Sequence, residues 1–151
     1  MFTPKQVAHN TIGIGEGKVA HSIPNLLILG FLAGMFIAFG SIGYNTASSS
    51  IPLPSVARLV GACVFPGGLT MVLIAGSELF TGNILINIGV LEGKVKFLSM
   101  LRNWVFVYAG NLAGALFVAY ACYAGGQFNM FGGALAVTMM KTAATKLSIS
   151  F

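Results

Sequence analysis

Charged residues are scarce in this chain, at 7% of its 151 residues, and only three are acidic. Soluble domains carry about 25% charged residues, so this composition argues against an ordinary water-soluble domain. Strands of alternating hydrophobicity are also lacking, which excludes an outer-membrane barrel. Because 56% of the residues are hydrophobic and the mean hydropathy is +0.88, we predict an all-α integral membrane protein that lies in a lipid bilayer.

Residues that bind metals or perform covalent chemistry are equally few. The two cysteines, Cys63 and Cys122, lie in apolar runs without the spacing of metal ligands, which indicates structural thiols. The two histidines, His9 and His21, lie in a polar N-terminal segment, where a solvated role and a pH-sensing role both remain open. With no nucleophile–base pair, metal cluster or phosphate-binding loop, the sequence predicts neither an enzyme nor a cofactor.

The net charge of +5 concerns orientation in the membrane rather than nucleic-acid binding. Residues 1–24 are polar and loosely amphipathic, and we interpret them as a cytoplasmic lead-in, without a cleavable signal peptide, to a multi-pass inner-membrane protein. The lysines and arginines flank the apolar segments in two sets, and the larger set marks the cytoplasmic side. The larger set holds Lys5, Lys18, Lys94, Lys96 and Arg102, and the other holds Arg58, Lys141 and Lys146.

Apolar segments predict a transmembrane repeat over residues 25–124. Its helices are expected over about residues 25–43, 57–75 together with 84–91, and 103–124, and residues 125–151 then form an external connection toward a fourth helix. The stretch 44–55 is rich in serine and proline, which is typical of a loop. Two GxxxG pairs, Gly30 with Gly34 and Gly110 with Gly114, predict close helix packing.

The second apolar segment is interrupted by Gly76, Ser77, Glu78, Leu79, Phe80, Thr81, Gly82 and Asn83. A charge or unpaired backbone group in hydrocarbon costs several kcal/mol, so such a segment must be buried in protein or line a wet cavity. We therefore predict a helix that is broken over residues 76–83, an arrangement typical of a substrate path. The alternative is a turn between two core helices of a soluble protein, which the composition disfavours.

Polar residues of this break carry specific expectations. An ionised carboxylate would repel anions, so we expect Glu78 to be buried away from any pore, holding loop backbone N–H groups or a subunit contact; a proton relay is the alternative. Thr81 and Asn83 are placed to cap the helix expected over residues 84–91. Two roles for Thr81 stay open, a cap alone and a cap that also contacts an anion.

The break resembles the signature of a known family. Its residues Gly76-Ser77-Glu78-Leu79-Phe80-Thr81-Gly82-Asn83 are similar to those of the formate/nitrite transporter family, which includes formate, nitrite and hydrosulfide channels. Further stretches agree with that family along nearly the whole chain, and together they are more specific than any one alone. They are Phe65-Pro66-Gly67-Gly68-Leu69, Arg102-Asn103-Trp104, Tyr108-Ala109-Gly110-Asn111-Leu112-Ala113-Gly114-Ala115 and Thr142-Ala143-Ala144-Thr145-Lys146.

The resemblance implies an aquaporin-like fold of two inverted three-helix repeats, of which this chain supplies the first, with a broken second helix. It also implies a homo-oligomer, a pentamer with one pore in each protomer. The family's central histidine and its partner asparagine belong to the second repeat, beyond Phe151, and neither His9 nor His21 matches that histidine.

Roles for individual residues follow from the same resemblance. Thr81 would offer its hydroxyl to the anion, and Lys146 would supply positive potential nearby. Apolar constrictions would be lined by Phe65, Leu69, Leu79 and Phe80. On spacing alone, Phe65 and Leu69 equally suit ordinary helix packing, and Lys146 equally suits a solvated loop.

The expected function is a passive channel or proton-coupled transporter for a small monovalent anion, namely formate, nitrite or hydrosulfide, across the cytoplasmic membrane. An alternative from another class is a non-transporting membrane scaffold or an incomplete half-channel. A neutral-solute channel of aquaporin type is disfavoured, because Asn83 is followed by Ile84 and no Asn-Pro-Ala triplet is present. The constriction residues are common apolar types, so they do not choose among the anions.

Overall fold

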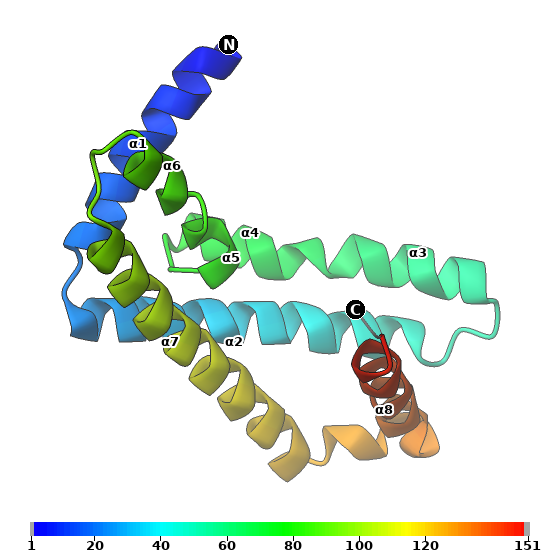
Figure 1. The fold of residues 1–151 in the computed structure, drawn as a ribbon. Coiled ribbons are helices and arrows are strands. Elements are labelled where there is room, and N and C mark those ends of the chain that lie inside the picture. Colours follow the sequence, from blue (N-terminus) through cyan, green and yellow to red (C-terminus); the bar gives the residue numbers. More distant parts are fainter. Residues whose placement is uncertain (1, 150–151) are drawn as a thin grey trace.

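The computed structural model describes residues 2–149 of the chain, and these residues form an all-α structure (Figure 1). Within them, three helical segments are long and apolar enough to cross a membrane, so the prediction of an all-α membrane protein is confirmed. The elements in chain order are α1 (Pro4–Ala20), α2 (Ile23–Ser48), α3 (Pro54–Val64), α4 (Pro66–Ile74), α5 (Phe80–Asn83), α6 (Ile86–Leu91), α7 (Phe97–Ala124), the 3-10 helix η1 (Gln127–Gly133) and α8 (Ala134–Leu147).

The first membrane-length helix, α2, continues beyond the end predicted at residue 43, so residues 44–48 are helical rather than loop. Its polar residues bond to the helix itself: the Ser48 hydroxyl donates to the Tyr44 carbonyl at 2.7 Å, and Asn45 Nδ2 donates to the Ser41 carbonyl at 2.8 Å. Side chains that favour loops in a sequence are thereby satisfied inside a helix. The third membrane-length helix, α7, also exceeds its predicted bounds, because it begins at Phe97 rather than near residue 103.

The second membrane-length segment consists of α3 and α4, which run back alongside α2 (Figure 1). It begins at Pro54, and Pro66 divides it into two helices, whereas the sequence suggested one helix over residues 57–75. Proline has no N–H to donate to the preceding turn, which explains the division. Phe65 between the two keeps helical backbone angles, with φ −53° and ψ −41°, so the chain continues in nearly the same direction.

The break itself is shorter than predicted. The chain leaves α4 through Gly76, whose φ of +61° is a conformation that favours glycine, and Leu79 is extended. Helical structure then resumes at Phe80, as α5 and then α6, rather than at residue 84. The broken second helix is confirmed, but its non-helical part covers residues 75–79 instead of residues 76–83.

Glycines bring α2 into direct contact with α7, as the two GxxxG pairs predicted. A Cβ atom added at Gly30 would lie 3.0 Å from the carbonyl oxygen of Val107, and one added at Gly114 would collide with the carbonyl oxygen of Phe31. A second contact of this kind, between Gly40 of α2 and Gly68 of α4, was not predicted. The three long segments are therefore held together at backbone distance.

The N-terminal and C-terminal segments are also helical. α1 packs against α6, where Gly15 of α1 lies under Ile86. Ile86 belongs to a small core cluster with Val95 and Met100. At the other end, η1 turns the chain and α8 lies beside the C-terminal part of α2 (Figure 1). The described part of 125–151 is therefore mostly helix.

Candidate functional site

The residues predicted for the break, 76–83, include a buried group and an exposed group. Ser77, Glu78 and Asn83 are 7%, 4% and 0% exposed. Gly76, Thr81 and Gly82 are exposed. The break therefore turns its only charge and one amide inward, and it leaves the Thr81 hydroxyl outward.

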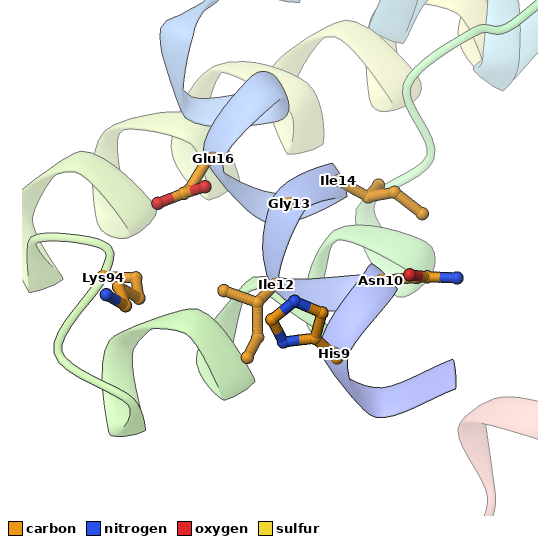
Figure 2. A pocket seen from close by; sticks show the side chains of 7 residues that line it. All are labelled: His9, Asn10, Ile12, Gly13, Ile14, Glu16 and Lys94. Atoms are coloured by element: carbon orange, nitrogen blue, oxygen red, sulfur yellow. The ribbon is translucent and has the colours of Figure 1, made fainter. Parts of the chain in front are cut away.

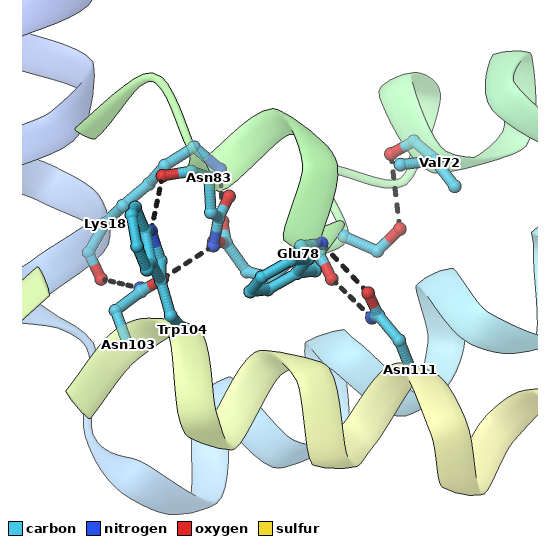
Figure 3. A network of polar contacts seen from close by, with 9 residues as sticks. Lys18, Val72, Glu78, Asn83, Asn103, Trp104 and Asn111 are labelled. Carbon is cyan, nitrogen blue, oxygen red and sulfur yellow. Dashed lines mark hydrogen bonds and ion pairs between the residues drawn. The ribbon is translucent and has the colours of Figure 1, made fainter. Parts of the chain in front are cut away.

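The buried carboxylate of Glu78 is paired (Figure 3). Its Oε1 lies 2.7 Å from the Lys18 ammonium of α1, and its Oε2 accepts a hydrogen bond from Asn83 Nδ2 at 2.6 Å. An unpaired carboxylate in this position would carry a large desolvation cost, which a cation and an amide donor offset. Burial of Glu78 was predicted correctly, but its partners are these two side chains rather than loop N–H groups.

The Lys18–Glu78 pair belongs to a closed ring of contacts. Asn83 Nδ2 also donates to Asn103 Oδ1 at 2.8 Å, and Asn103 Nδ2 donates to the backbone carbonyl of Lys18 at 3.0 Å. The Trp104 indole N–H adds a bond to the Asn83 carbonyl at 2.9 Å. The ring therefore ties α1, the break and α7 to one another (Figure 3).

The amide of Asn111 on α7 satisfies the backbone at the start of α5. Its Oδ1 accepts from the Phe80 N–H at 2.9 Å, and its Nδ2 donates to the carbonyls of Gly30 and Glu78 at 2.8 and 2.9 Å. The Asn111 side chain thus caps the N-terminus of α5, although it belongs to α7. The prediction that Thr81 and Asn83 cap the second half-helix is wrong, because the N-cap residues are Leu79 for α5 and Leu85 for α6, and the Asn83 side chain bonds to Glu78 and Asn103 instead.

Leu79, Phe80 and Thr81 are the predicted pore residues that lie at the break. Leu79 and Phe80 are half-buried. The Phe80 ring packs edge-on against Trp104 and Tyr108, with ring centroids 6.1 and 5.5 Å apart. Thr81 is exposed, and its hydroxyl makes no hydrogen bond with any residue among those described. Its hydroxyl is therefore free to bind a solute.

Phe65, Leu69 and Lys146 lie away from the break. Phe65 and Leu69 are 43% and 45% exposed on neighbouring turns of α3–α4. A pocket of about 480 Å³ between α2, α3 and α8 is lined by both Phe65 and Lys146. The structure thus brings these two predicted site residues together, in a pocket that Leu79, Phe80 and Thr81 do not line.

Another pocket, of about 600 Å³, lies on the N-terminal helix and contains His9, Glu16 and Lys94 (Figure 2). These charged and titratable side chains are all exposed, and the described part of the chain shows no ion pair between Glu16 and Lys94. None of the predicted site residues lines this pocket. Among residues 2–149 there is also no group of three potential metal ligands.

Four side chains that organise the break were not predicted as site residues, namely Lys18, Asn103, Trp104 and Asn111. The sequence held one indication of Lys18: a carboxylate at membrane depth, such as that of Glu78, requires a cation as partner. The amides gave no such signal, because Asn103 and Asn111 lie within an apolar helix and their partners depend on how α7 packs.

Comparison with known proteins gives one family. The family model described as "Formate/nitrite transporter" matches residues 5–151. The chain is 39% identical over 120 residues to the formate channel BtFdhC of Bacillus thuringiensis, which covers 78% of this chain and 46% of that protein. It is 40% identical over 124 residues to a probable formate transporter of Methanothermobacter thermautotrophicus, covering 78% of this chain and 45% of that protein.

A more distant relative agrees. The formate channel FocA of Escherichia coli strain K12 is 31% identical over 126 residues, covering 82% of this chain and 44% of FocA. The chain therefore spans less than half the length of each of these relatives.

Proposed function

This chain belongs to the formate/nitrite transporter family, whose members are embedded in membranes, and from that premise we propose that it builds part of a path for small monovalent anions. The predicted resemblance is thereby confirmed. Members of this family transport solutes and are not enzymes, in keeping with the sequence-based prediction.

The observation that carries the proposal is the paired carboxylate at the break. With Lys18 at 2.7 Å, Glu78 does not present an uncompensated negative charge to the region around Thr81. An anion path needs this, because an unpaired carboxylate in a low-dielectric region repels anions strongly. The Phe80 N–H donates to Asn111 Oδ1, so it needs no hydrogen bond from solvent or from the anion. The backbone of the break therefore keeps its conformation while an anion passes.

We assign the hydroxyl of Thr81 the role of a hydrogen-bond donor to the anion. Lys146 supplies positive charge in the pocket that it lines together with Phe65. Phe65 and Leu69 on one segment, and Leu79 and Phe80 at the break, form the apolar constrictions on either side. A path of this kind binds the anion strongly enough for entry and weakly enough for release. Formate is the first candidate because several relatives are named as formate channels.

The relatives are more than twice the length that this chain matches, so the proposed path includes a second repeat that pairs with this one. The proposed assembly is a homo-pentamer with the N-terminus in the cytoplasm. Passive flow and proton-coupled transport are both compatible with the residues described. The rival function is a membrane scaffold, in which the same buried ring around Glu78 would serve only structure.

Anion uptake by liposomes that contain the purified full-length protein tests the proposal. Formate, nitrite and hydrosulfide are supplied in parallel, at neutral and mildly acidic pH, and protein-free liposomes give the background. We expect saturable uptake of at least one of these anions. A folded oligomer that takes up none of them would favour the scaffold instead.

A further inference from the structure

The ring of Phe80, at the start of α5, contacts two aromatic rings of α7. Its centroid lies 6.1 Å from that of Trp104, with an interplanar angle of 72°, and 5.5 Å from that of Tyr108, with an angle of 74°. Both contacts are edge-to-face, a geometry that aromatic pairs prefer. Because Trp104 and Tyr108 are four positions apart, two successive turns of α7 hold the one ring.

Trp104 is itself tied to the break (Figure 3). Its indole N–H donates to the backbone carbonyl of Asn83 at 2.9 Å, and Asn83 is 0% exposed within the ring of contacts around Glu78. The Trp104 side chain would lose this hydrogen bond if it turned away. It therefore presents a fixed surface to Phe80.

The backbone of Phe80 is held separately from its ring. Its N–H donates to Asn111 Oδ1 at 2.9 Å, and the preceding residue, Leu79, is extended with φ −104° and ψ 127°. With the backbone held at Asn111, a change of side-chain rotamer at Phe80 would break the contacts with Trp104 and Tyr108. The next residue, Thr81, carries the exposed hydroxyl, so the same contacts also fix where the ring lies relative to that hydroxyl.

Tyr108 differs from Trp104 in its surroundings. It is 56% exposed, whereas Phe80 is half-buried. Much of the Tyr108 side chain thus has no neighbour in the described structure, and its removal would leave room for the Phe80 ring to move. Phe80 therefore depends on Tyr108 for its position on that side.

We propose that Trp104 and Tyr108 are positioning residues that fix the ring of Phe80 and thereby set the size of anion that passes the break. This inference rests on the proposed function, in which Phe80 forms part of an apolar constriction. A ring held in one rotamer gives an opening of constant width, which passes formate more readily than a longer carboxylate. A ring released from either contact populates a second rotamer, so the discrimination by size falls.

Formate and propionate are suitable probes, because they share a carboxylate and differ in the length of the carbon chain. Their uptake is measured in liposomes that contain the full-length protein, at neutral pH, and protein-free liposomes correct for leakage of the neutral acids. Tyr108→Leu and Trp104→Leu should each lower the ratio of formate to propionate uptake roughly two- to tenfold, which is the range that one aromatic pair contributes.

Two further variants separate positioning from general damage to the fold. Tyr108→Phe keeps the ring and should keep the ratio of the unmodified protein. Tyr120→Leu, at a 69% exposed position on the same helix, is the matched control and should also leave the ratio unchanged.

The position of the ring can be followed without transport. With 4-fluorophenylalanine in place of Phe80, fluorine NMR of the protein in lipid nanodiscs should give one resonance. Tyr108→Leu should shift this resonance or add a second one, whereas Tyr108→Phe should leave a single resonance. An unchanged resonance in Tyr108→Leu would show that the Phe80 ring does not need Tyr108.

The uptake ratio decides the rest of the inference. Equal uptake of formate and propionate by the unmodified protein would overturn it, as would a ratio that survives both Tyr108→Leu and Trp104→Leu. Formate uptake with either result leaves the proposed function standing. An unmodified protein that takes up none of formate, nitrite and hydrosulfide refutes the proposed function, and the fluorine resonance still decides whether the rings of α7 position Phe80.

Discussion

The ammonium of Lys18 and the carboxylate of Glu78 lie 2.7 Å apart, across a separation of 60 positions in the chain. The Lys18 side chain is 24% exposed and that of Glu78 is 5% exposed, so the carboxylate is buried while the ammonium keeps partial contact with solvent. This contact fastens α1 onto the break. Because a buried pair depends on both members, the two residues should behave as a unit in mutagenesis.

Removal of one member should therefore cost more than removal of both. Lys18→Met leaves Glu78 buried with Asn83 as its side-chain donor, and we expect a loss of roughly 3 kcal/mol in the free energy of unfolding. The double variant Lys18→Met with Glu78→Gln should recover much of that loss. Thermal unfolding of the purified full-length protein gives the four values of the cycle.

The control for this cycle is Lys94→Met, since Lys94 is exposed and makes no ion pair within the described residues. It should change the free energy of unfolding by less than about 0.5 kcal/mol. Strictly additive effects of the two substitutions would contradict a coupled pair at the break.

The hydrogen bonds of Asn111 should contribute about as much to the free energy of unfolding as the Lys18–Glu78 pair does. Asn111→Leu removes an acceptor for the Phe80 N–H and donors for two carbonyls, and we expect a loss of roughly 2–4 kcal/mol. Hydrogen exchange should rise first in the peptide that contains Phe80. Leu112→Ala, at the exposed neighbouring position, is the comparison that keeps the exchange of this peptide low. Unchanged exchange in Asn111→Leu would show that Phe80 has another acceptor.

Close packing of α2 on α7 gives a steric prediction. A methyl group at Gly114 would meet the Phe31 carbonyl oxygen, so Gly114→Ala should force the helices apart and destabilise the protein by roughly 1–3 kcal/mol. A methyl group at Gly67 would meet nothing within 4 Å, which makes Gly67→Ala the matched control. The two unfolding temperatures are compared directly, and equal values would mean that α2 and α7 tolerate separation.

Local patterns explain why much of the fold was predictable. Apolar length identified the long helices, the GxxxG pairs identified the face between α2 and α7, and the polar run with glycines identified the break. The helix ends were less predictable at Ser48 and Phe80. Ser48 bonds to the carbonyl of its own helix, and the N–H of Phe80 is satisfied by Asn111, which lies 31 positions away.

The candidate site was predictable only in part for the same reason. Burial of Glu78 follows from the cost of a charge in hydrocarbon, which is a property of one residue. Its partner Lys18 lies 60 positions away, so that contact depends on how α1 docks onto the break, and no local pattern encodes that docking.

Thr81 gives the most direct test of the proposed anion path. Thr81→Val keeps the shape of the side chain and removes a hydroxyl that is free in the described structure, so we expect anion uptake to fall roughly tenfold with the oligomer intact. Thr70→Val is the control, because the Thr70 hydroxyl already donates a hydrogen bond to the Pro66 carbonyl at 3.0 Å. Uptake that is equal in Thr81→Val and in the unmodified protein would count against contact with the anion.

Lys146 should act on the anion partly at a distance, and salt can reveal this. Lys146 is exposed, so its field is screened within about 8 Å at physiological ionic strength but extends to about 30 Å at 0.01 M. Lys146→Ala should therefore lower uptake more at low salt than at high salt. Lys141→Ala, on the same helix but outside the pocket of Phe65, should have a smaller effect at both salt concentrations. If the loss in Lys146→Ala were the same at low and high salt, attraction over distance would be the wrong explanation, and the lysine would act through direct contact alone.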